Sequence, residues 1–259
     1  MNKVFIIAEA GTAHEGSLEI ALAMISDAYK AKANAIKFQI YKAEEIVDKK
    51  DKLYDFFKAR EFGWSDWRRL KDHADNIGIE FMASVFGEWS IDVYKRLDGK
   101  TWKVASRSQR DYGLICEGLD HGADIIISTG MDKGHMEDYI SELVNQVESH
   151  SEESPQDEEY LREHITILHC VSKYPVPDEE ANLKKVGNML RVFDNIGYSD
   201  HTIGDVAVLG AVALGATVIE KHLNHWETSP THPDYKCGLN VIQFKLMVEE
   251  IRRLEVMNG

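Results

Sequence analysis

Two histidines stand at the ends of two successive predicted strands. The stretch 197–222 reads GYSDHTIGDVAVLGAVALGATVIEKH, so one short strand ends near His201, a helix of small apolar residues follows, and a second strand ends at His222. In a right-handed strand–helix–strand unit, the carboxyl ends of the two parallel strands lie side by side. Two imidazoles placed there could form half of the coordination shell of a divalent metal. Alternatively, each histidine could cap its strand by bonding to a backbone carbonyl, and the spacing alone leaves both interpretations open.

Two lysines interrupt predicted strands that are otherwise apolar. Lys37 lies in AIKFQ and Lys103 lies in WKVA. An ammonium group inside a buried strand is costly unless it is paired with an acid or holds an anion. The lysines therefore indicate a site for a small phosphorylated or carboxylated metabolite, with a histidine-bound metal polarising a carbonyl group. Two alternatives remain: an ion pair with Glu9 or another acid inside the fold, and a lysine that forms a Schiff base with its substrate.

Polar residues occur at or near the carboxyl end of every predicted strand. In a barrel of parallel strands these ends share one mouth, where active sites are built. Hydroxyl groups there would donate hydrogen bonds to an anion beside the lysines. The polar set is Glu9, Lys37, Gln39, Ser84, Lys103, Ser106, Ser128, Thr129, Ser172, Tyr174, Ser199, His201 and His222.

Eight short apolar segments alternate with helical patterns along the chain. Such short, β-branched segments are typical of strands that are buried on both faces. We predict an α/β fold, a single (β/α)8 TIM barrel over residues 1–259. A doubly wound open sheet is the alternative, but the turn after the first strand reads EAGTAHEG and lacks the GxGxxG of a dinucleotide site. The predicted strands cover 4–8, 35–39, 80–84, 102–105, 124–128, 165–169, the stretch that ends near 201, and 216–222, and the predicted helices outside the opening stretch cover 17–31, 66–77, 90–97, 113–121, 136–147, 179–192 and 241–256.

Three segments depart from this alternation. Residues 41–51 are rich in lysine and acids, and we expect irregular structure there. The aromatic residues between 54 and 67 are expected to form a packed flap or a dimer contact. Residues 148–163, ESHSEESPQDEEYLRE, are acidic and have little apolar surface to bury, so we predict a solvated loop.

The composition is that of a globular protein in a reducing compartment. Its 259 residues are 44% hydrophobic and 29% charged, and no apolar run approaches the roughly 20 residues that cross a bilayer. Cys116, Cys170 and Cys237 are widely spaced and are expected to be buried fillers without a disulfide. The net charge of −14 disfavours nucleic acid as a partner. We predict a cytoplasmic protein with neither a nucleic-acid nor a membrane partner.

Motifs in a fixed order run along almost the whole chain. They are FIIAEAGTAHEGSL, AIKFQ, FMASVF, WKVAS, IISTGM, ILHCVSKYPVP, GYSDHTIG, GAVALGATVIEKH and PDYKCGLN. In this order and spacing they resemble the sialic acid synthase family, the N-acetylneuraminate synthases and their relatives for other nonulosonic acids. The resemblance implies a TIM barrel that condenses phosphoenolpyruvate with an aldose, typically an N-acetylhexosamine or its 6-phosphate, and releases phosphate by C–O cleavage. It also implies a homodimer and a divalent metal, Mn²⁺ ahead of Mg²⁺ or Co²⁺.

The resemblance implies roles for individual residues. His201 and His222 match the metal ligands. Glu9 matches a carboxylate that could orient or deprotonate the attacking water. The residues that match the phosphoenolpyruvate site are Lys37, Ser84, Lys103, Ser106, Ser128, Tyr174 and Ser199, and those that match the sugar side are Glu9, Gln39 and Asp234.

The departures from the family pattern suggest a rebuilt acceptor side. Ala13, Ser108 and Ser172 stand where the family commonly has an asparagine, an acid and an asparagine, respectively. The family usually continues into an antifreeze-like domain that lends an arginine to a partner's sugar site, and we expect no such domain in these 259 residues. Arg107 and Arg110 would suit an acceptor with its own phosphate or carboxylate, or else they pair with surface acids.

Two other classes of function stay open. One is a lyase that runs a metal- or lysine-assisted aldol reaction on a 2-keto acid sugar without phosphoenolpyruvate. The other is a family member without catalysis that acts as a partner of another synthase, and the retained histidines and lysines argue against it. His14 and His232, in loops at the mouth, are further candidates for substrate contact.

Overall fold

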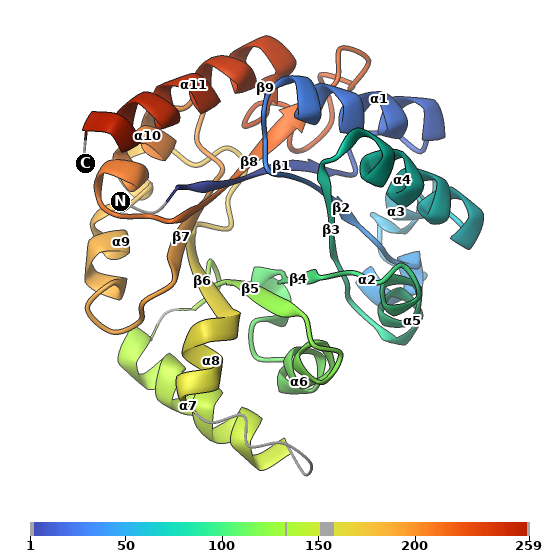
Figure 1. Ribbon diagram of the computed structural model, residues 1–259. Helices are drawn as coiled ribbons and strands as arrows, with labels where there is room; N and C mark the ends of the chain where they lie inside the picture. The colour runs from blue at the N-terminus through green and yellow to red at the C-terminus, as the bar shows by residue number, and fades with distance from the viewer. Residues whose placement is uncertain (1–2, 133, 151–157, 258–259) are drawn as a thin grey trace.

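The computed structural model describes residues 3–132, 134–150 and 158–257 of the chain. Within them, eight parallel strands follow one another around a barrel, which closes because β1 pairs with both β2 and β8 (Figure 1). The prediction of a (β/α)8 TIM barrel is confirmed. The strands are β1 (Phe5–Gly11), β2 (Ala35–Gln39), β3 (Glu80–Ser84), β4 (Thr101–Val104), β5 (Asp124–Ser128), β6 (Ile165–Cys170), β7 (Ile196–Asp200) and β8 (Val218–Asn224), and a short β9 (Leu239–Asn240) pairs with the end of β8.

Helices between the strands cover the outside of the barrel. The first, α1 (Leu18–Lys30), begins after Ser17, whose hydroxyl accepts a hydrogen bond from the Ile20 N–H at 3.3 Å, as the sequence predicted for a cap. In the described residues no helix is both long and apolar enough to cross a membrane. The other helices are α2 (Ala43–Ile46), α3 (Tyr54–Lys58), α4 (Trp64–Ile77), α5 (Glu88–Arg96), α6 (Tyr112–Asp120), α7 (Met136–His150), α8 (Glu158–His164), α9 (Lys184–Met189), α10 (Val206–Ala213) and α11 (Val241–Met257), with 3₁₀ turns at Ser106–Ser108 and Asp178–Glu180.

Side chains inside the barrel form an apolar layer and, next to it, a polar layer. The apolar layer contains Ile7, Ala35, Met82, Ile126, Leu168 and Val218. Because alternate residues of a strand point to the same face, the residues two positions further along also point inward, one layer nearer the carboxyl ends of the strands. Those positions hold Glu9, Lys37, Ser84, Ser128, Cys170 and Glu220. The alternation therefore closes one end of the barrel interior with apolar side chains and makes the other end polar.

The strand predictions agree with the structure more closely than the helix predictions do. The predictions for 35–39, 80–84 and 124–128 coincide with β2, β3 and β5. The single helix predicted over 179–192 is wrong, since only a 3₁₀ turn and the short α9 occur there. Asn182 lies between them with a φ of 48°, a left-handed conformation that an α-helix does not contain.

The solvated loop predicted over 148–163 is wrong at both ends. Helix α7 continues to residue 150 and α8 starts at Glu158, while residues 151–157 lie outside the described part of the chain. In α8, Leu161 is buried and Arg162 bonds to Glu158 one turn earlier at 2.7 Å. The buried leucine, the intrahelical ion pair and the hydrogen bond from Arg162 to the Val192 carbonyl at 3.2 Å hold this short helix on the barrel wall, although the acidic composition hides it.

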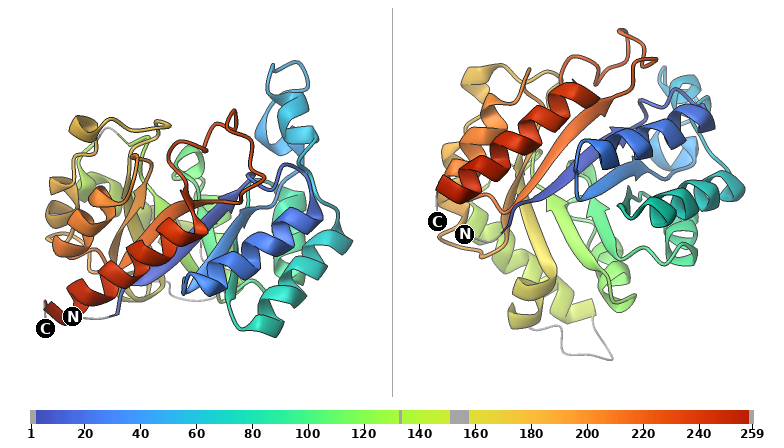
Figure 2. Two further views of the ribbon diagram at one scale, coloured as in Figure 1. Left: turned by 90° about the horizontal axis from the view of Figure 1, so that it is seen from above. Right: turned by 45° about the horizontal axis from the view of Figure 1, so that its top comes forward.

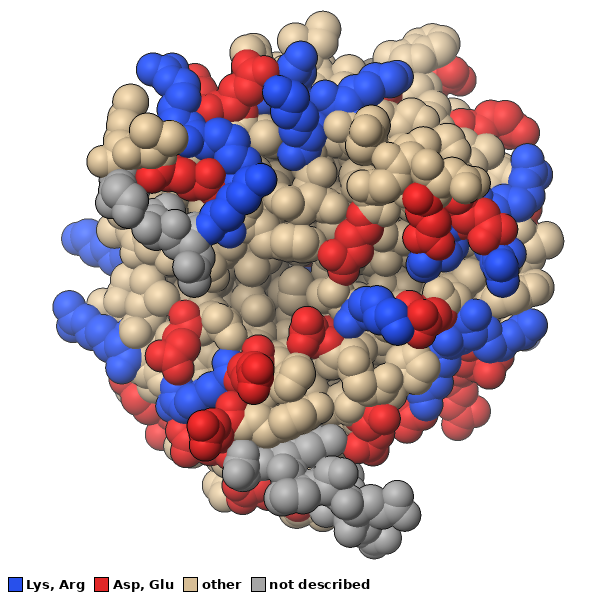
Figure 3. All heavy atoms as spheres, viewed as in Figure 1, with Lys and Arg blue, Asp and Glu red and all other residues tan. Residues whose placement is uncertain are grey.

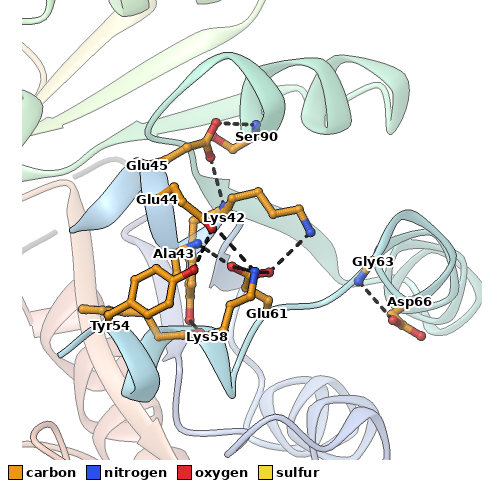
Figure 4. A network of polar contacts seen from close by, with 12 residues as sticks. Lys42, Ala43, Glu44, Glu45, Tyr54, Lys58, Glu61, Gly63, Asp66 and Ser90 are labelled. Atoms are coloured by element: carbon orange, nitrogen blue, oxygen red, sulfur yellow. Dashed lines mark hydrogen bonds and ion pairs between the residues drawn. The ribbon is translucent and has the colours of Figure 1, made fainter. Parts of the chain in front are cut away.

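The chain between β2 and α4 forms α2 and α3, where the sequence predicted irregular structure and a flap. Glu61 accepts hydrogen bonds from the Ala43 N–H at 2.5 Å and from the Lys58 ammonium at 3.2 Å (Figure 4). Glu45 accepts from the Ser90 N–H at the start of α5, at 3.4 Å (Figure 4). These two carboxylates tie the segment to itself and to the barrel wall.

The two ends of the barrel differ in their loops and in their charged side chains. Figure 2 shows α3 and the loop between β8 and β9 projecting from the same end, opposite both chain termini. The end near the termini faces the viewer in Figure 3, where acidic and basic side chains are interspersed around a largely uncharged centre. The long loops and the polar layer therefore belong to the other end, at the carboxyl ends of the strands.

Candidate active site

A cavity of about 250 Å³ opens at the polar end of the barrel. Most of the residues that the sequence placed at this mouth line it, and four described residues of that set do not: Thr129, Arg110, His14 and His232. The spacing of polar residues along the strands is therefore sufficient to locate the site. The predicted residues that line the cavity are Glu9, Lys37, Gln39, Ser84, Lys103, Ser106, Arg107, Ser128, Ser172, Tyr174, Ser199, His201, His222 and Asp234.

Lys37 lies at the centre of a buried ionic cluster. Its ammonium is 2.5 Å from the Glu9 carboxylate and 3.6 Å from that of Glu220. It also donates a hydrogen bond to the Ser84 hydroxyl at 3.2 Å. The ion pair with Glu9 that the sequence raised as an alternative is thus present, and all three charged groups of the cluster line the cavity.

Lys103 lies in the same cavity without an acidic partner. Its ammonium donates to the Ser128 hydroxyl at 2.7 Å and to the Val104 carbonyl at 3.1 Å, and it makes no ion pair among the described residues. Burial lowers the pKa of Lys103. The charge of Glu220 acts on Lys103 from beyond ion-pair distance. No carboxylate of the described residues contacts this buried ammonium directly, so this part of the cavity has the capacity to hold a bound anion.

The two carboxylates beside Lys37 are held in different protonation states. Burial, the largest influence, and the nearby charge of Glu220 raise the pKa of Glu9 to about 7, although Lys37 opposes them. Burial also raises the pKa of Glu220, but Lys37, Lys103 and the hydrogen bond from Ser199 outweigh it and bring that pKa down to about 2. At neutral pH, Glu220 is therefore a fixed negative charge, whereas Glu9 can gain or lose a proton.

Glu220 is a site residue that the sequence reasoning missed. It lies two positions before His222 in β8, and its carboxylate accepts a hydrogen bond from the Ser199 hydroxyl at 3.0 Å. The signal was present in ATVIEKH, because the two-residue period of a strand puts Glu220 on the same face as His222. The period also puts the intervening Lys221 on the opposite face.

Gly130, two residues after β5, packs closely against three residues of the cavity lining, Ser106, Cys170 and Ser172. The Gly130 N–H donates a hydrogen bond to the Ser106 hydroxyl at 3.0 Å. A Cβ atom on Gly130 would lie 2.6 Å from the Ser172 hydroxyl and 3.1 Å from the Cys170 sulfur, so a side chain does not fit here. Burial raises the pKa of Cys170 to about 11, which keeps it a thiol and agrees with the filler role predicted for it.

His201 and His222 come together as the strand–helix–strand argument predicted. Their ring centroids are 5.4 Å apart, and the Tyr174 ring lies 4.1 Å from that of His201. The His201 Nδ1–H donates to the Val171 carbonyl at 2.8 Å, which leaves its Nε2 as the nitrogen with a free lone pair. Burial is the main cause that lowers the pKa of His201 to about 4 and that of His222 to about 3.

The chemistry of this pair fits a divalent metal. Both imidazoles are neutral at physiological pH, and a neutral ring nitrogen is the form that binds a metal. No group of three or more His, Cys, Asp or Glu side chains arranged for a metal occurs in residues 3–132, 134–150 and 158–257. The two histidines would thus supply half a shell and leave the other positions to substrate and water.

The two arginines of the acceptor hypothesis have different surroundings. Arg107 lines the cavity, is exposed, and makes no ion pair within the described part of the chain. Arg110 contacts Glu142 and lies 3.3 Å from Asp132, which is the pairing with acids that the sequence left open. The structure therefore favours Arg107 over Arg110 for contact with a ligand in the cavity.

The outer wall of the cavity is partly apolar. It contains Ile46 of α2, Phe57 of α3, Phe86 after β3, and Met131 after β5. Hydrogen bonds to Glu61 and Glu45 hold the segment that carries Ile46 and Phe57 (Figure 4). The cavity thus has a charged floor and a wall on which an apolar substituent could pack.

The remaining predicted loop residues are Asp234, His232 and His14. The Asp234 carboxylate is 3.7 Å from His222 Nδ1 and 3.9 Å from His232 Nδ1, and burial raises the pKa of Asp234. His232 bonds through its Nε2 to the Thr12 hydroxyl at 3.0 Å and does not line the cavity. His14 is also outside the lining and stacks on Phe62 at 4.5 Å.

Comparison with protein families gives one match that covers most of the chain. Residues 24–259 match the model described as the NeuB family. The match spans all the strands except β1 and includes both lysines and both histidines of the cavity.

Individual relatives agree with this match. The chain is 32% identical to the N,N'-diacetyllegionaminic acid synthase of Legionella pneumophila over 98% of its own length and 73% of the relative. It is 34% identical to a pseudaminic acid synthase of Campylobacter jejuni over 99% of its own length and 75% of the relative. A crystal structure of N-acetylneuraminic acid (sialic acid) synthetase from Leptospira borgpetersenii in complex with citrate superimposes with a TM-score of 0.87 at 32% identity, covering 100% of this chain and 86% of that one.

Proposed function

The chain belongs to the NeuB family, and we propose that it condenses phosphoenolpyruvate with an aldose to give a 2-keto sugar acid of the nonulosonic type, with release of phosphate by C–O cleavage. It is a transferase of the sialic acid synthase type. The observation that carries the proposal is a single cavity that joins two neutral histidines to Lys103, a buried lysine that makes no ion pair within the described residues. Such a cavity can hold an anion beside an activated carbonyl group.

Phosphoenolpyruvate binds on the charged floor of the cavity in this proposal. Lys103 suits its phosphate or carboxylate, because its ammonium contacts the Ser128 hydroxyl and the Ser106 hydroxyl lines the same cavity. Lys37 offers a second ammonium but already contacts Glu9. Binding of the anion would therefore redistribute the contacts of Lys37 between the ligand and its carboxylates.

The acceptor aldose binds between the histidines and the outer wall. C3 of the enol attacks the aldehyde carbon, and negative charge develops on the aldehyde oxygen. A divalent metal on His201 and His222, which we propose to be Mn²⁺, would stabilise that charge when bound. Gln39 and Asp234 both line the cavity, lie close together beside Gly11, and can hold sugar hydroxyls.

Water then adds at C2, and the C2–O bond to phosphate breaks. Glu9 lies on the floor with a pKa of about 7, so its carboxylate can accept the proton of the attacking water near neutral pH. Glu220 keeps a permanent negative charge beside Lys37 and Lys103 and leaves Glu9 as the titrating group. The two carboxylates therefore divide into a proton acceptor and a charge-balancing residue.

We further propose that the acceptor carries its own anionic group. The support is Arg107, an exposed guanidinium at the cavity that has no acidic partner in the described residues. A guanidinium binds phosphate or carboxylate with two parallel hydrogen bonds.

The direct test is an assay of phosphate release with phosphoenolpyruvate, Mn²⁺ and a panel of aldoses with and without a phosphate. Phosphoenolpyruvate labelled with ¹⁸O at the bridging position should deliver the label to the released phosphate, because the C2–O bond is the one that breaks. Label retained in the keto acid would contradict the proposal. Turnover of unphosphorylated N-acetylmannosamine alone would contradict the anionic acceptor but not the synthase.

The lyase alternative is separated by chemical trapping. A Schiff-base enzyme is covalently labelled when borohydride is added with pyruvate. We expect no labelled lysine in this protein, and a pyruvyl adduct on Lys103 would overturn the synthase proposal.

A further inference from the structure

The proposed metal histidines each follow a residue of a second, fully buried ion pair. Asp200 precedes His201 at the end of β7, and Lys221 precedes His222 in β8; both charged residues are 0% exposed. The Lys221 ammonium lies 2.6 Å from the Asp200 carboxylate. Because strand residues alternate in direction, this pair lies behind the strands, on the side of the helices, while the histidines face the cavity.

The ion pair lies on the last rung that β7 and β8 share. Their register pairs Asp200 with Lys221, and Ser199 with Glu220 one rung earlier. Since β7 ends at Asp200, His201 has no partner in β8 through the ladder of backbone hydrogen bonds. The distance between the two imidazoles therefore depends on other bonds.

The buried pair supplies bonds to the residue that follows His201. The Asp200 carboxylate accepts from the Thr202 N–H at 2.9 Å, from the Thr202 hydroxyl at 3.1 Å and from the Tyr198 hydroxyl at 3.0 Å. The Lys221 ammonium donates to the Thr202 carbonyl at 2.7 Å. His201 is thereby clamped between two residues that are both fixed to the strand of His222.

Stability alone gives a weak reason for such a pair. Removing two charges from water costs several kcal/mol each, and replacing a buried pair by apolar residues of similar size is often neutral or stabilising. The four hydrogen bonds to Asp200 use the full acceptor capacity of a carboxylate and fix its position. The arrangement is therefore better suited to setting a geometry than to adding stability.

We propose that Asp200 and Lys221 are positioning residues that fix the spacing of His201 and His222 and so set the affinity for the divalent metal. This inference rests on the proposed function of the two histidines. Groups behind the direct ligands of a metal orient those ligands, and their loss typically weakens binding 10- to 100-fold. Neither Asp200 nor Lys221 lines the cavity, so phosphoenolpyruvate does not need them for its own binding.

The test is calorimetric titration of Mn²⁺ into metal-stripped protein. The main variant combines Asp200→Leu with Lys221→Met, which removes both charges and leaves no lone buried ion. We expect a folded protein whose Mn²⁺ Kd is roughly 10- to 100-fold weaker, whose Kd for phosphoenolpyruvate without metal changes less than about twofold, and whose turnover recovers at high Mn²⁺. The control variant, Lys95→Ala with Glu117→Ala, removes an exposed pair and should leave the Mn²⁺ Kd unchanged.

An unchanged Mn²⁺ Kd in the folded double variant would overturn the inference. So would a loss of phosphoenolpyruvate binding as large as that of metal binding, since a general structural role predicts both. If the double variant does not fold, Thr202→Val decides, because it keeps both charges and removes one bond to Asp200. We expect that variant to weaken Mn²⁺ binding about threefold or more, and wild-type affinity would overturn the inference. The proposed metal site itself is tested separately with His201→Ala. If that variant binds Mn²⁺ as tightly as the wild type, the two histidines are not the metal ligands.

Discussion

At the scale of single residues, two carboxylates share one lysine and still differ in their protonation. Glu9 and Glu220 both contact Lys37, but Glu220 also receives a hydrogen bond from Ser199 and the attraction of Lys103. One carboxylate is therefore held ionised, and its charge helps to hold the other partly protonated. This division of roles is testable through pH.

Glu220→Gln should lower the pKa of Glu9. Activity that needs ionised Glu9 rises with pH and is half-maximal near pH 7 in the wild type, because the pKa of Glu9 is about 7. Removing the charge of Glu220 should move this midpoint to lower pH by about one unit, and the rate should fall because Lys37 and Lys103 lose a counter-charge. The measurement is kcat/KM for phosphoenolpyruvate against pH. Glu117→Gln on the surface is the control, and an unmoved midpoint in Glu220→Gln would argue against the coupling.

Arg107→Ala and Arg110→Ala should separate the two arginines. Loss of a charged hydrogen-bonding partner costs about 1.5–3 kcal/mol, so KM for an anionic acceptor should rise roughly 10- to 100-fold in Arg107→Ala. Arg110 is occupied by Glu142 and Asp132, so its loss should leave KM within about twofold. Steady-state kinetics with the best aldose of the panel decide between them. Equal effects of the two substitutions would sink the assignment of Arg107.

Sequence reasoning finds a site residue where the residue type is rare for its position. Lys37 and Lys103 stand out because lysine is unusual in a buried strand, and the histidines stand out because they end two strands of one unit. Glu220 is harder to find, because it lies inside its strand and is marked only by the two-residue period that places it on the same face as His222. The ion pair of Asp200 and Lys221 could not be predicted, since it depends on the register between β7 and β8.

At the scale of elements, the segment with α2 and α3 is pressed against the loop after β1. Gly16 in that loop has a φ of +80°, and a Cβ there would lie 2.3 Å from the Ala59 carbonyl oxygen just after α3. Arg60 contacts Glu15 in the same loop, and the Ser229 N–H donates to Glu15 at 3.1 Å. Three segments from distant parts of the chain therefore meet at one side of the mouth.

Gly16→Ala should weaken the packing of the loop after β1 against the end of α3. The added methyl group would strain the left-handed backbone and push the carbonyl of Ala59 away. Because Ala59 directly follows α3, this displacement would also shift Phe57, which forms part of the cavity wall. We expect KM for the acceptor to rise several-fold and KM for phosphoenolpyruvate to change little. Gly78→Ala is a matched control, because Gly78 has a φ of +82° with nothing within 4 Å of its Cβ position. Both variants should lose about 1 kcal/mol of stability to backbone strain, and an acceptor KM raised equally in both would contradict the steric argument.

Strands and helices differ in how well the sequence predicted them. Strands of a barrel are apolar on both faces and are bounded by the turns, so their ranges are readable. Helices on the barrel wall are held by contacts that the local sequence does not contain, as with Glu45 reaching α5 and Leu161 buried in an acidic run. The positive φ of Asn182 is likewise a product of the tertiary fold.

At the scale of the whole molecule, several histidines are buried in the neutral form. Burial lowers the pKa of His14 and His222 to about 3 and that of His201 to about 4. In the unfolded chain each returns to an ordinary pKa near 6.5 and binds a proton more readily. The stability that these groups contribute is therefore complete above pH 6.5 and is lost as the pH falls toward their folded values.

His14→Phe should flatten this pH dependence without touching the cavity lining. The Nε2 of His14 has no hydrogen-bond partner among the described residues, and its ring stacks on Phe62. A phenyl ring keeps the stacking and removes the titrating group, at the cost of the one hydrogen bond that His14 Nδ1 accepts from the Gly16 N–H at 3.1 Å. Between pH 6 and 4.5 the free energy of unfolding of the wild type should fall by about 1 kcal/mol per pH unit more than that of the variant. Urea unfolding at several pH values measures both slopes. Parallel slopes would show that His14 is not the buried neutral group described.

The alternation of apolar segments with helical patterns predicted the fold class. The position of the site could then be predicted, because the carboxyl ends of barrel strands share one mouth. The homodimer stays a prediction, because it depends on surfaces that no local pattern identifies. The exposed apolar side chains of α10 and α11, such as Val206 and Ile242, are where a partner could bury surface. Sedimentation measurements would settle the oligomeric state.

The closed apolar layer at one end of the barrel has a kinetic consequence. The charged floor lies next to Ile7, Met82 and Leu168, which are fully buried, so among the described residues the mouth is the route by which a ligand reaches it. An aldose seated against Phe57 and Arg107 would then lie in the path of phosphoenolpyruvate. Turnover should accordingly follow a compulsory order, with phosphoenolpyruvate first and the sugar second. The sugar alone, at high concentration, should then act as a dead-end inhibitor that competes with phosphoenolpyruvate.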